Sequence, residues 1–137
     1  LPNDSIAHVF EVLIRGTSYR VVLADLGPRP LYPRRRILEQ LLELVGENPE
    51  RTILLGDFNT PFESVWFDAY REKLTHAFEH SGRGIRETWP WVLPALSLDH
   101  IWLSPDLKPL ASGKRYGLSD HAMVFAIAEQ ATQKRER

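Results

Sequence analysis

Apolar residues dominate two stretches near the start of the chain and set the first expectation about its fold. Residues Ile6–Arg15 and Tyr19–Leu26 are rich in Val, Ile and Leu, and the segment GTS between them is typical of a tight turn. We therefore expect a β-hairpin. The second stretch is apolar almost throughout, which indicates a strand buried on both faces inside a sheet.

A helical pattern follows the hairpin after a loop rich in proline. Pro33 suits the first position of a helix, and Gly46 and Pro49 end the pattern. The apolar positions between them are Ile37, Leu38, Leu41, Leu42, Leu44 and Val45. We expect this apolar stripe to pack against the sheet.

The remaining chain predicts further strands, one more helix and a long loop. RTILLG at 51–56 is a short apolar strand, and residues 62–74 have apolar positions at helical spacing. Residues 81–95 contain too much Gly and Pro for either element, and therefore predict a loop.

Two later segments, 97–105 and 121–129, are typical strands, whereas the stretch 107–119 between them has no clear pattern. Strands thus alternate with helices early and neighbour one another late. This order favours the α/β (α+β) class, with a mixed β-sheet and helices on one face.

Length and charge limit the functions that remain. A chain of 137 residues is sized for a single domain, 1–137, with a polar tail at 129–137 that we expect to fray. Its 17 basic and 18 acidic side chains leave a net charge of -1, so no global field attracts nucleic acid or anionic membranes. The absence of Cys excludes disulfide partners and thiolate catalysis.

Targeting signals are also lacking in this sequence. No apolar stretch reaches membrane-spanning length, and the first ten residues have neither a basic region nor an apolar core. The chain begins without Met. These features fit a soluble domain cut from a longer or membrane-anchored protein, and they leave the compartment open.

Polar residues at three strand ends are the candidates for chemistry. Asp57 and Asn59 follow the strand TILLG, Asp99 opens the strand HIWLS, and Asp120 with His121 opens AMVFAIA. Ends of neighbouring strands converge in sheets of this type, so these side chains can form one site. Taken singly, each motif also fits a turn in which the side chain only binds backbone amides.

Taken together and in this order, GDFNTP, SLDHIWLSP and GLSDHAMVF resemble the C-terminal half of the endonuclease/exonuclease/phosphatase family. These metal-dependent phosphoesterases include the DNase I-like nucleases, abasic-site endonucleases, sphingomyelinases and inositol-polyphosphate phosphatases. The resemblance extends from about Phe10 to Ala128. It implies a fold that is half of the DNase I-like four-layer sandwich.

The resemblance also implies a role for each site residue. Asp57 would orient or deprotonate the attacking water, and Asn59 would donate to a phosphate oxygen. Asp99 would accept a hydrogen bond from His121, which approaches the scissile phosphate. Asp57 and Asp120 would lie beside a divalent ion, Mg²⁺ or Mn²⁺, because such ions prefer carboxylate oxygens.

The sequence departs from the family in two respects. The family's N-terminal half, with its metal-binding Glu and an upstream Asn, has no counterpart here, and Asp25 stands where the family often has His. Two hypotheses follow. The chain is either a Mg²⁺-dependent phosphoesterase that is weak or inactive without its other half, or a noncatalytic interaction module that kept the fold. A metal-binding Glu in a segment preceding Leu1 would favour the enzyme.

The resemblance further predicts the partners of this chain. They are a phosphate-ester substrate and the missing N-terminal half of the domain. Because two sheets pack face to face in the family, we expect this half to form one sheet whose inner face is bare. Such a face would drive self-association.

Other conspicuous residues have simpler interpretations. We expect the basic run Arg34–Arg36 to be a solvated helix face and the segment Lys114–Tyr116 to be an exposed turn. Trp89 and Trp91 either stack on a substrate or close the core. Strand alternation places His100 on the face opposite Asp99, so we interpret it as structural.

Overall fold

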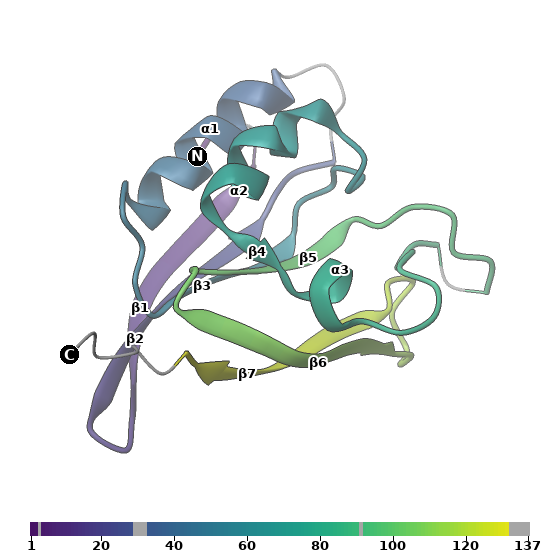
Figure 1. Ribbon diagram of the computed structural model, residues 1–137. Coiled ribbons are helices and arrows are strands. Elements are labelled where there is room, and N and C mark those ends of the chain that lie inside the picture. Colours follow the sequence, from purple (N-terminus) through teal and green to yellow (C-terminus); the bar gives the residue numbers. More distant parts are fainter. Residues whose placement is uncertain (3, 29–32, 91, 132–137) are drawn as a thin grey trace.

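The computed structural model describes residues 1–2, 4–28, 33–90 and 92–131, which form three layers (Figure 1). The central layer is a five-stranded mixed sheet of order β1-β2-β3-β5-β4. Helices α1 and α2 cover one of its faces, and a two-stranded sheet, β6-β7, lies on the other. The strands of both sheets are β1 Ile6–Ile14, β2 Thr17–Asp25, β3 Thr52–Asp57, β4 Thr75–His76, β5 Asp99–Leu103, β6 Leu107–Arg115 and β7 Met123–Gln130.

The predicted hairpin is confirmed as β1 and β2, which are antiparallel. Arg15 and Gly16 in its turn both have positive φ, 49° and 81°, the combination that a tight turn matching the strand twist requires. Strand β3 then runs parallel to β2. The crossover between these two strands carries α1, Arg34–Val45, which begins one residue after the predicted Pro33.

The main core lies between the helices and the central sheet. The apolar stripe of α1 is buried there, together with sheet residues whose side chains alternate toward the helices. The sheet contributes Val22, Ala24, Leu54 and Trp102 to this cluster. Alternation in β5 therefore places Trp102 and His100 on the helix side and the intervening Ile101 on the opposite side.

The second sheet corrects two expectations. Residues 107–119 had no clear pattern in the sequence, but Leu107–Arg115 form β6 and pair with β7. The inner face of the central sheet is therefore not bare, because this hairpin packs over β3 and β5. Val124 and Ala126 of β7 pack against the same small cluster of buried residues as Ile53 and Leu55 of β3, which gives this layer its own core.

The segment predicted as one helix at 62–74 is divided into shorter elements. A 3-10 turn, η1 Val65–Phe67, leads into α2, Asp68–Lys73. The helix ends because Leu74 adopts an extended conformation and leads into β4. A further short helix, α3 Ala77–Ser81, was not expected from the sequence.

The first two residues of the expected tail, 129–130, belong to a strand. Glu129 and Gln130 belong to β7, where they pair with Lys108 and Leu107. Residues 132–137 and Trp91 lie outside the described residues. No helix in the described part of the chain is long and apolar enough to span a membrane.

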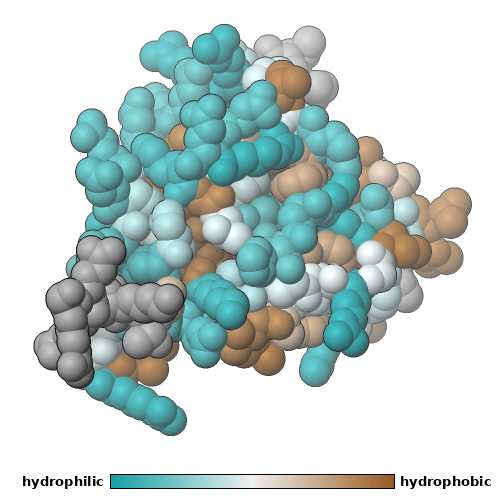
Figure 2. Space-filling model, in the orientation of Figure 1, coloured by the Kyte–Doolittle hydropathy of each residue, from teal (hydrophilic) through white to brown (hydrophobic). Residues whose placement is uncertain are grey.

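Apolar side chains remain exposed where the β6-β7 sheet does not reach. Figure 2 shows mainly hydrophilic atoms over the helices and hydrophobic ones along the lower edge, near the two-stranded sheet. Phe10 and Ile14 of β1 lie on the inner face of the central sheet and are exposed. A cavity of about 450 Å³ opens between the two sheets beside Ile14 and Tyr19.

Candidate active site

The register of the central sheet aligns three carboxylates at one end. Asp25 of β2 pairs with Asp57 of β3, and Asp57 pairs with Asp99 of β5. Directly paired residues of neighbouring strands point to the same face. This face is the one that carries Ile53 and Ile101, so the row of aspartates points toward the side of the β6-β7 sheet.

His121 reaches this row from the second sheet, just before β7 begins. Its Nδ1 lies 2.8 Å from Asp99 Oδ2. The same oxygen accepts a hydrogen bond of 2.6 Å from the hydroxyl of Thr88, which is 0% exposed. Thr88 in turn accepts the backbone N–H of Leu98 and of Asp99. The predicted contact between Asp99 and His121 is therefore confirmed, and Thr88 holds the carboxylate from behind.

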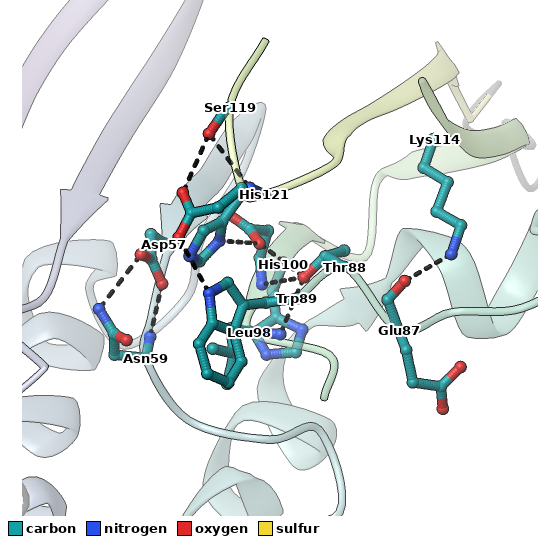
Figure 3. A network of polar contacts seen from close by, with 12 residues as sticks. Asp57, Asn59, Glu87, Thr88, Trp89, Leu98, His100, Lys114, Ser119 and His121 are labelled. Carbon is teal, nitrogen blue, oxygen red and sulfur yellow. Dashed lines mark hydrogen bonds and ion pairs between the residues drawn. The ribbon is translucent and has the colours of Figure 1, made fainter. Parts of the chain in front are cut away.

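Asn59 is bonded to Asp57 through both its backbone and its side chain (Figure 3). Its N–H donates to Asp57 Oδ1 at 2.8 Å, and its Nδ2 donates to Asp57 Oδ2 at 3.1 Å. Nδ2 also donates to the carbonyl of Leu26 at 2.6 Å. Both amide protons are thus occupied, so donation to a phosphate oxygen, the role implied by the resemblance, would require one of these bonds to break.

Gly56 allows β3 to approach β2 closely just before the site. It has a φ of 138°, and a Cβ at this position would lie 1.9 Å from the carbonyl oxygen of Ala24. Only glycine tolerates both the conformation and the contact. The Gly of GDFNTP therefore sets the position of Asp57.

The surroundings of Asp57 and His121 raise the pKa of both side chains. Burial raises the pKa of Asp57 to about 6. The hydrogen bond from the Asn59 N–H and the charge of His121 lower this pKa, whereas the negative charges of Asp99 and Asp25 raise it further. Burial alone would lower the pKa of His121. The hydrogen bond and charge of Asp99, with the charges of Asp57 and Asp120, outweigh burial and raise this pKa above 6.5.

Asp57, Asp99 and His121 together could hold a metal ion. One ligand atom from each lies within 4.8 Å of the others, and they form the one such group in the part of the chain that the structure describes. Asp120 is not a member of this group. Its exposed carboxylate accepts a hydrogen bond from Trp89 Nε1 at 3.1 Å, which lowers the pKa of Asp120.

His100, which follows Asp99, is a buried structural residue, as predicted. His100 is buried and its Nε2 lies 2.9 Å from the carbonyl of Thr60, while its Nδ1 lies 3.1 Å from His76 Nε2. The backbone N–H of Glu79 donates to His76 Nδ1. Because Thr60 offers only an acceptor, these contacts require both rings to be neutral, with each Nε2 carrying the proton.

Arg34, Lys114 and Arg115 differ from their sequence interpretation, and the structure also places Trp89, for which two alternatives were open. Arg34 is only 7% exposed, although the basic run was expected to be solvated, and its Nη2 donates to the carbonyl of Gly27. Lys114 and Arg115 lie in β6 instead of a turn. Trp89 is half-buried, with its ring centroid 6.3 Å from that of His121, so it forms one wall beside the site.

Thr88 and Arg34 were missed as site residues. Thr88 lies in a segment read only as a loop, and Arg34 belongs to a charge run that is ordinarily solvated. Neither has a local sequence signal, because each acts on a residue that is distant along the chain.

The three layers and the polar side chains gathered at the strand ends define an α/β protein with a candidate active site at one end of its central sheet. The family model for the Endonuclease/Exonuclease/phosphatase family matches residues 2–121, and the chain belongs to this family. No curated protein matches the chain.

Solved structures support the same fold. A functionally unknown conserved protein from Enterococcus faecalis V583 aligns with a TM-score of 0.74 at 17% identity, over 92% of this chain and 56% of that chain. A humanized TDP2 from D. rerio aligns with a TM-score of 0.73 at 18% identity, over 92% and 61%. The mannosyl-6-phosphatase Bt3783 from Bacteroides thetaiotaomicron VPI-5482 has a TM-score of 0.64 at 20% identity, over 84% and 52%.

At these identities the likeness establishes the fold alone. It confirms the predicted DNase I-like α/β architecture. The chain spans little more than half the length of these solved structures.

Proposed function

We propose that this chain carries the hydrolytic half of a Mg²⁺- or Mn²⁺-dependent phosphoesterase. The observation that carries the proposal is the convergence of Asp57 and His121 from two different sheets, with Asp99 hydrogen-bonded to His121. A carboxylate able to orient water opposite a positively charged imidazole is the arrangement that phosphate-ester hydrolysis requires.

The donor set fits a hard divalent cation. Asp57 and Asp99 offer carboxylate oxygens on adjacent strands, and Asp99 Oδ1 receives no hydrogen bond from the described residues. Asp120 is a candidate to bind a water of the ion. When bound, such an ion supplies positive charge that stabilises the negative phosphoryl oxygens of the transition state. With few carboxylates in contact, we expect weak binding in which the ion keeps most of its water.

Asp57, Asn59 and His121 each have a separate role in the proposed reaction. Asp57, with a pKa of about 6, is largely ionised at neutral pH and still basic enough to orient or accept a proton from water. Asn59 holds both carboxylate oxygens of Asp57 in place. His121 is favoured as the imidazolium by Asp99, and so faces the substrate as a positive ligand or proton donor.

The substrate class is a phosphate mono- or diester. Similar solved structures include a mannosyl-6-phosphatase and a TDP2 complexed with a single-strand DNA product, so the fold serves both small and polymeric substrates. The net charge of -1 favours a small ester over a long nucleic-acid groove.

Part of the inner face of the central sheet is apolar and exposed, which favours binding of a partner. Phe10 and Ile14 lie on it without a covering layer among the described residues. We infer that either the other half of the domain or a second copy of this chain covers this face, and that the chain alone is weakly active or inactive.

Hydrolysis assays test the proposal. The chain, alone and joined to an N-terminal half of the family's type, is incubated with p-nitrophenyl phosphate and bis-p-nitrophenyl phosphate in the presence of Mg²⁺, Mn²⁺ or a chelator. We expect metal-dependent release of nitrophenolate that Asp57→Asn abolishes and that Asp68→Asn, an exposed acidic control on α2, leaves unchanged.

Binding gives a second readout of the same site. Mn²⁺ should broaden NMR signals around Asp57 and Asp99 and leave those around Asp106, at the other end of the sheet, intact. Turnover that persists in Asp57→Asn, or a complete lack of metal-dependent turnover in the joined protein, would instead favour a noncatalytic module.

A further inference from the structure

The segment Leu26–Gly27, which follows β2, braces the Asp57–Asn59 pair. The Leu26 N–H donates to the backbone carbonyl of Asp57 at 2.9 Å, and the Leu26 carbonyl accepts the side-chain amide of Asn59 at 2.6 Å. Leu26 is fully buried. The position of the Asn59 amide therefore depends on the position of the Leu26 backbone.

The backbone of the next residue, Gly27, is hydrogen-bonded to two buried side chains. The Gly27 N–H donates to the hydroxyl of Ser5 at 3.0 Å, and the Gly27 carbonyl accepts Nη2 of Arg34 at 2.5 Å. Ser5 is 3% exposed and Arg34 is 7% exposed. Every backbone polar group of Leu26 and Gly27 is thus bonded, two of them to the site and two to these buried side chains.

Arg34 occupies an unfavourable place for a cation. It is the first residue of α1, where the helix dipole opposes positive charge. Burial lowers the pKa of Arg34, although the charge of Asp57 opposes this effect. Its Nη1 is also buried without a hydrogen-bond partner among the described residues. A buried and incompletely bonded cation destabilises a fold, which indicates that Arg34 serves the site more than the core.

We propose that Arg34 is a positioning residue for Asn59. By holding the Gly27 carbonyl it fixes the adjacent Leu26 carbonyl, which keeps the Asn59 amide on Asp57. A role for Arg34 in catalysis rests on the proposed function. Its effect on the position of the Asn59 amide does not, and can be measured on the chain without metal. Lysine replaces the guanidinium poorly here, because the planar fork fixes the direction of its donors whereas an ammonium is a flexible point charge.

The experiment follows the side-chain amide of Asn59 by two-dimensional ¹⁵N–¹H NMR on the 137-residue chain. The signal is assigned by its loss in Asn59→Asp, and the exposed Asn48 amide is the internal reference. In Arg34→Met we expect the Asn59 amide to shift and its hydrogen exchange to accelerate about tenfold, as for the loss of one hydrogen bond. Arg36→Met, an exposed change in the same helical turn, should leave the signal unchanged.

Two further variants keep the test decisive if Arg34→Met does not fold. Arg34→Lys retains the charge and one donor, so we expect an intermediate acceleration. Ser5→Ala removes the other support of Gly27 and should accelerate exchange in the same direction. An Asn59 signal that is unmoved in folded Arg34→Met, or in both Arg34→Lys and Ser5→Ala, would overturn the proposal.

The outcome is independent of catalysis. Faster exchange of the Asn59 amide supports the bracing role even if no phosphate ester is hydrolysed, which would count against the proposed function alone. If the enzyme is active but the Asn59 signal is unchanged in Arg34→Met, only the positioning role of Arg34 is contradicted.

Discussion

His121 Nδ1 lies 2.8 Å from Asp99 Oδ2, and the two residues come from different layers of the fold. Asp99 begins β5 in the central sheet, whereas His121 lies in the loop that leads into β7 of the second sheet, two residues before this strand begins. The contact therefore forms only when the two sheets are docked. The geometry of the candidate site therefore depends on the packing of the β6-β7 hairpin.

Asp99→Asn should weaken this contact with little change in shape. The carboxylate charge that helps to raise the pKa of His121 is lost, so we expect this pKa to fall, as measured by NMR titration of the imidazole. In an active form of the enzyme, hydrolysis should fall by about 100-fold or more. Asp68→Asn is the control, and an unchanged His121 titration would contradict the electrostatic role of Asp99.

The buried histidine pair should make stability depend on pH. Burial lowers the pKa of His100 to about 4 and that of His76 to about 2, whereas an unfolded histidine titrates near 6.5. The unfolded state therefore binds more protons below pH 6.5. The stabilisation is fully present above pH 6.5 and declines as the pH falls toward 4, by up to about 1.4 kcal/mol per pH unit for each histidine.

Chemical denaturation between pH 7.5 and 5 measures this dependence. A His100→Gln variant should be less stable at neutral pH and should show a shallower loss of stability on acidification. His121 contributes with the opposite sign, because its raised pKa gives stabilisation that is present below pH 6.5 and is lost as pH rises through the folded pKa. The raised pKa of Asp57 acts in the same direction as that of His121, so the comparison with the variant decides: an equally steep loss of stability in His100→Gln and in the wild type would contradict a neutral, buried His100.

Gly56→Ala should disturb the site through the backbone. The new Cβ would meet the Ala24 carbonyl oxygen at 1.9 Å, so we expect a loss of roughly 3 kcal/mol or more in the free energy of unfolding. Gly46→Ala is a matched control, since Gly46 also has a positive φ of 92° but has open space around it. Equal losses in the two variants would mean that φ, and not close strand approach, explains Gly56.

The exposed inner face predicts self-association. At about tens of micromolar, sedimentation should show a species larger than the monomer, because apolar surface of this kind pairs readily in water. Phe10→Lys, at a 44% exposed residue on the inner face, should shift the population toward monomer. Leu13→Lys is the control, since Leu13 is 72% exposed on the opposite face of the same strand. A clean wild-type monomer would show that the face needs no cover.

Much of the site was predictable where its residues are close in sequence. Asp57 and Asn59 are two positions apart, and a short polar motif after an apolar strand is enough to indicate their turn. The contact of Asp99 with His121 was predicted from the family resemblance that three motifs in this order carry. The bracing by Arg34 and Thr88 was not predicted, because a local pattern does not show which distant backbone group a side chain will bind.

The sequence by itself determined the hairpin, the crossover helix, the central strands and the acidic strand ends, because each depends on hydrophobic periodicity or turn chemistry within a short window. The tertiary structure decided the rest. Strand β6 forms where it can pair with β7 and pack on α3 and β5, and the predicted helix at 62–74 was shortened by the extended residue Leu74 that leads into β4. Likewise, Arg34 is buried because the Gly27 carbonyl lies beside the start of α1, a juxtaposition created by the packing of helix on sheet.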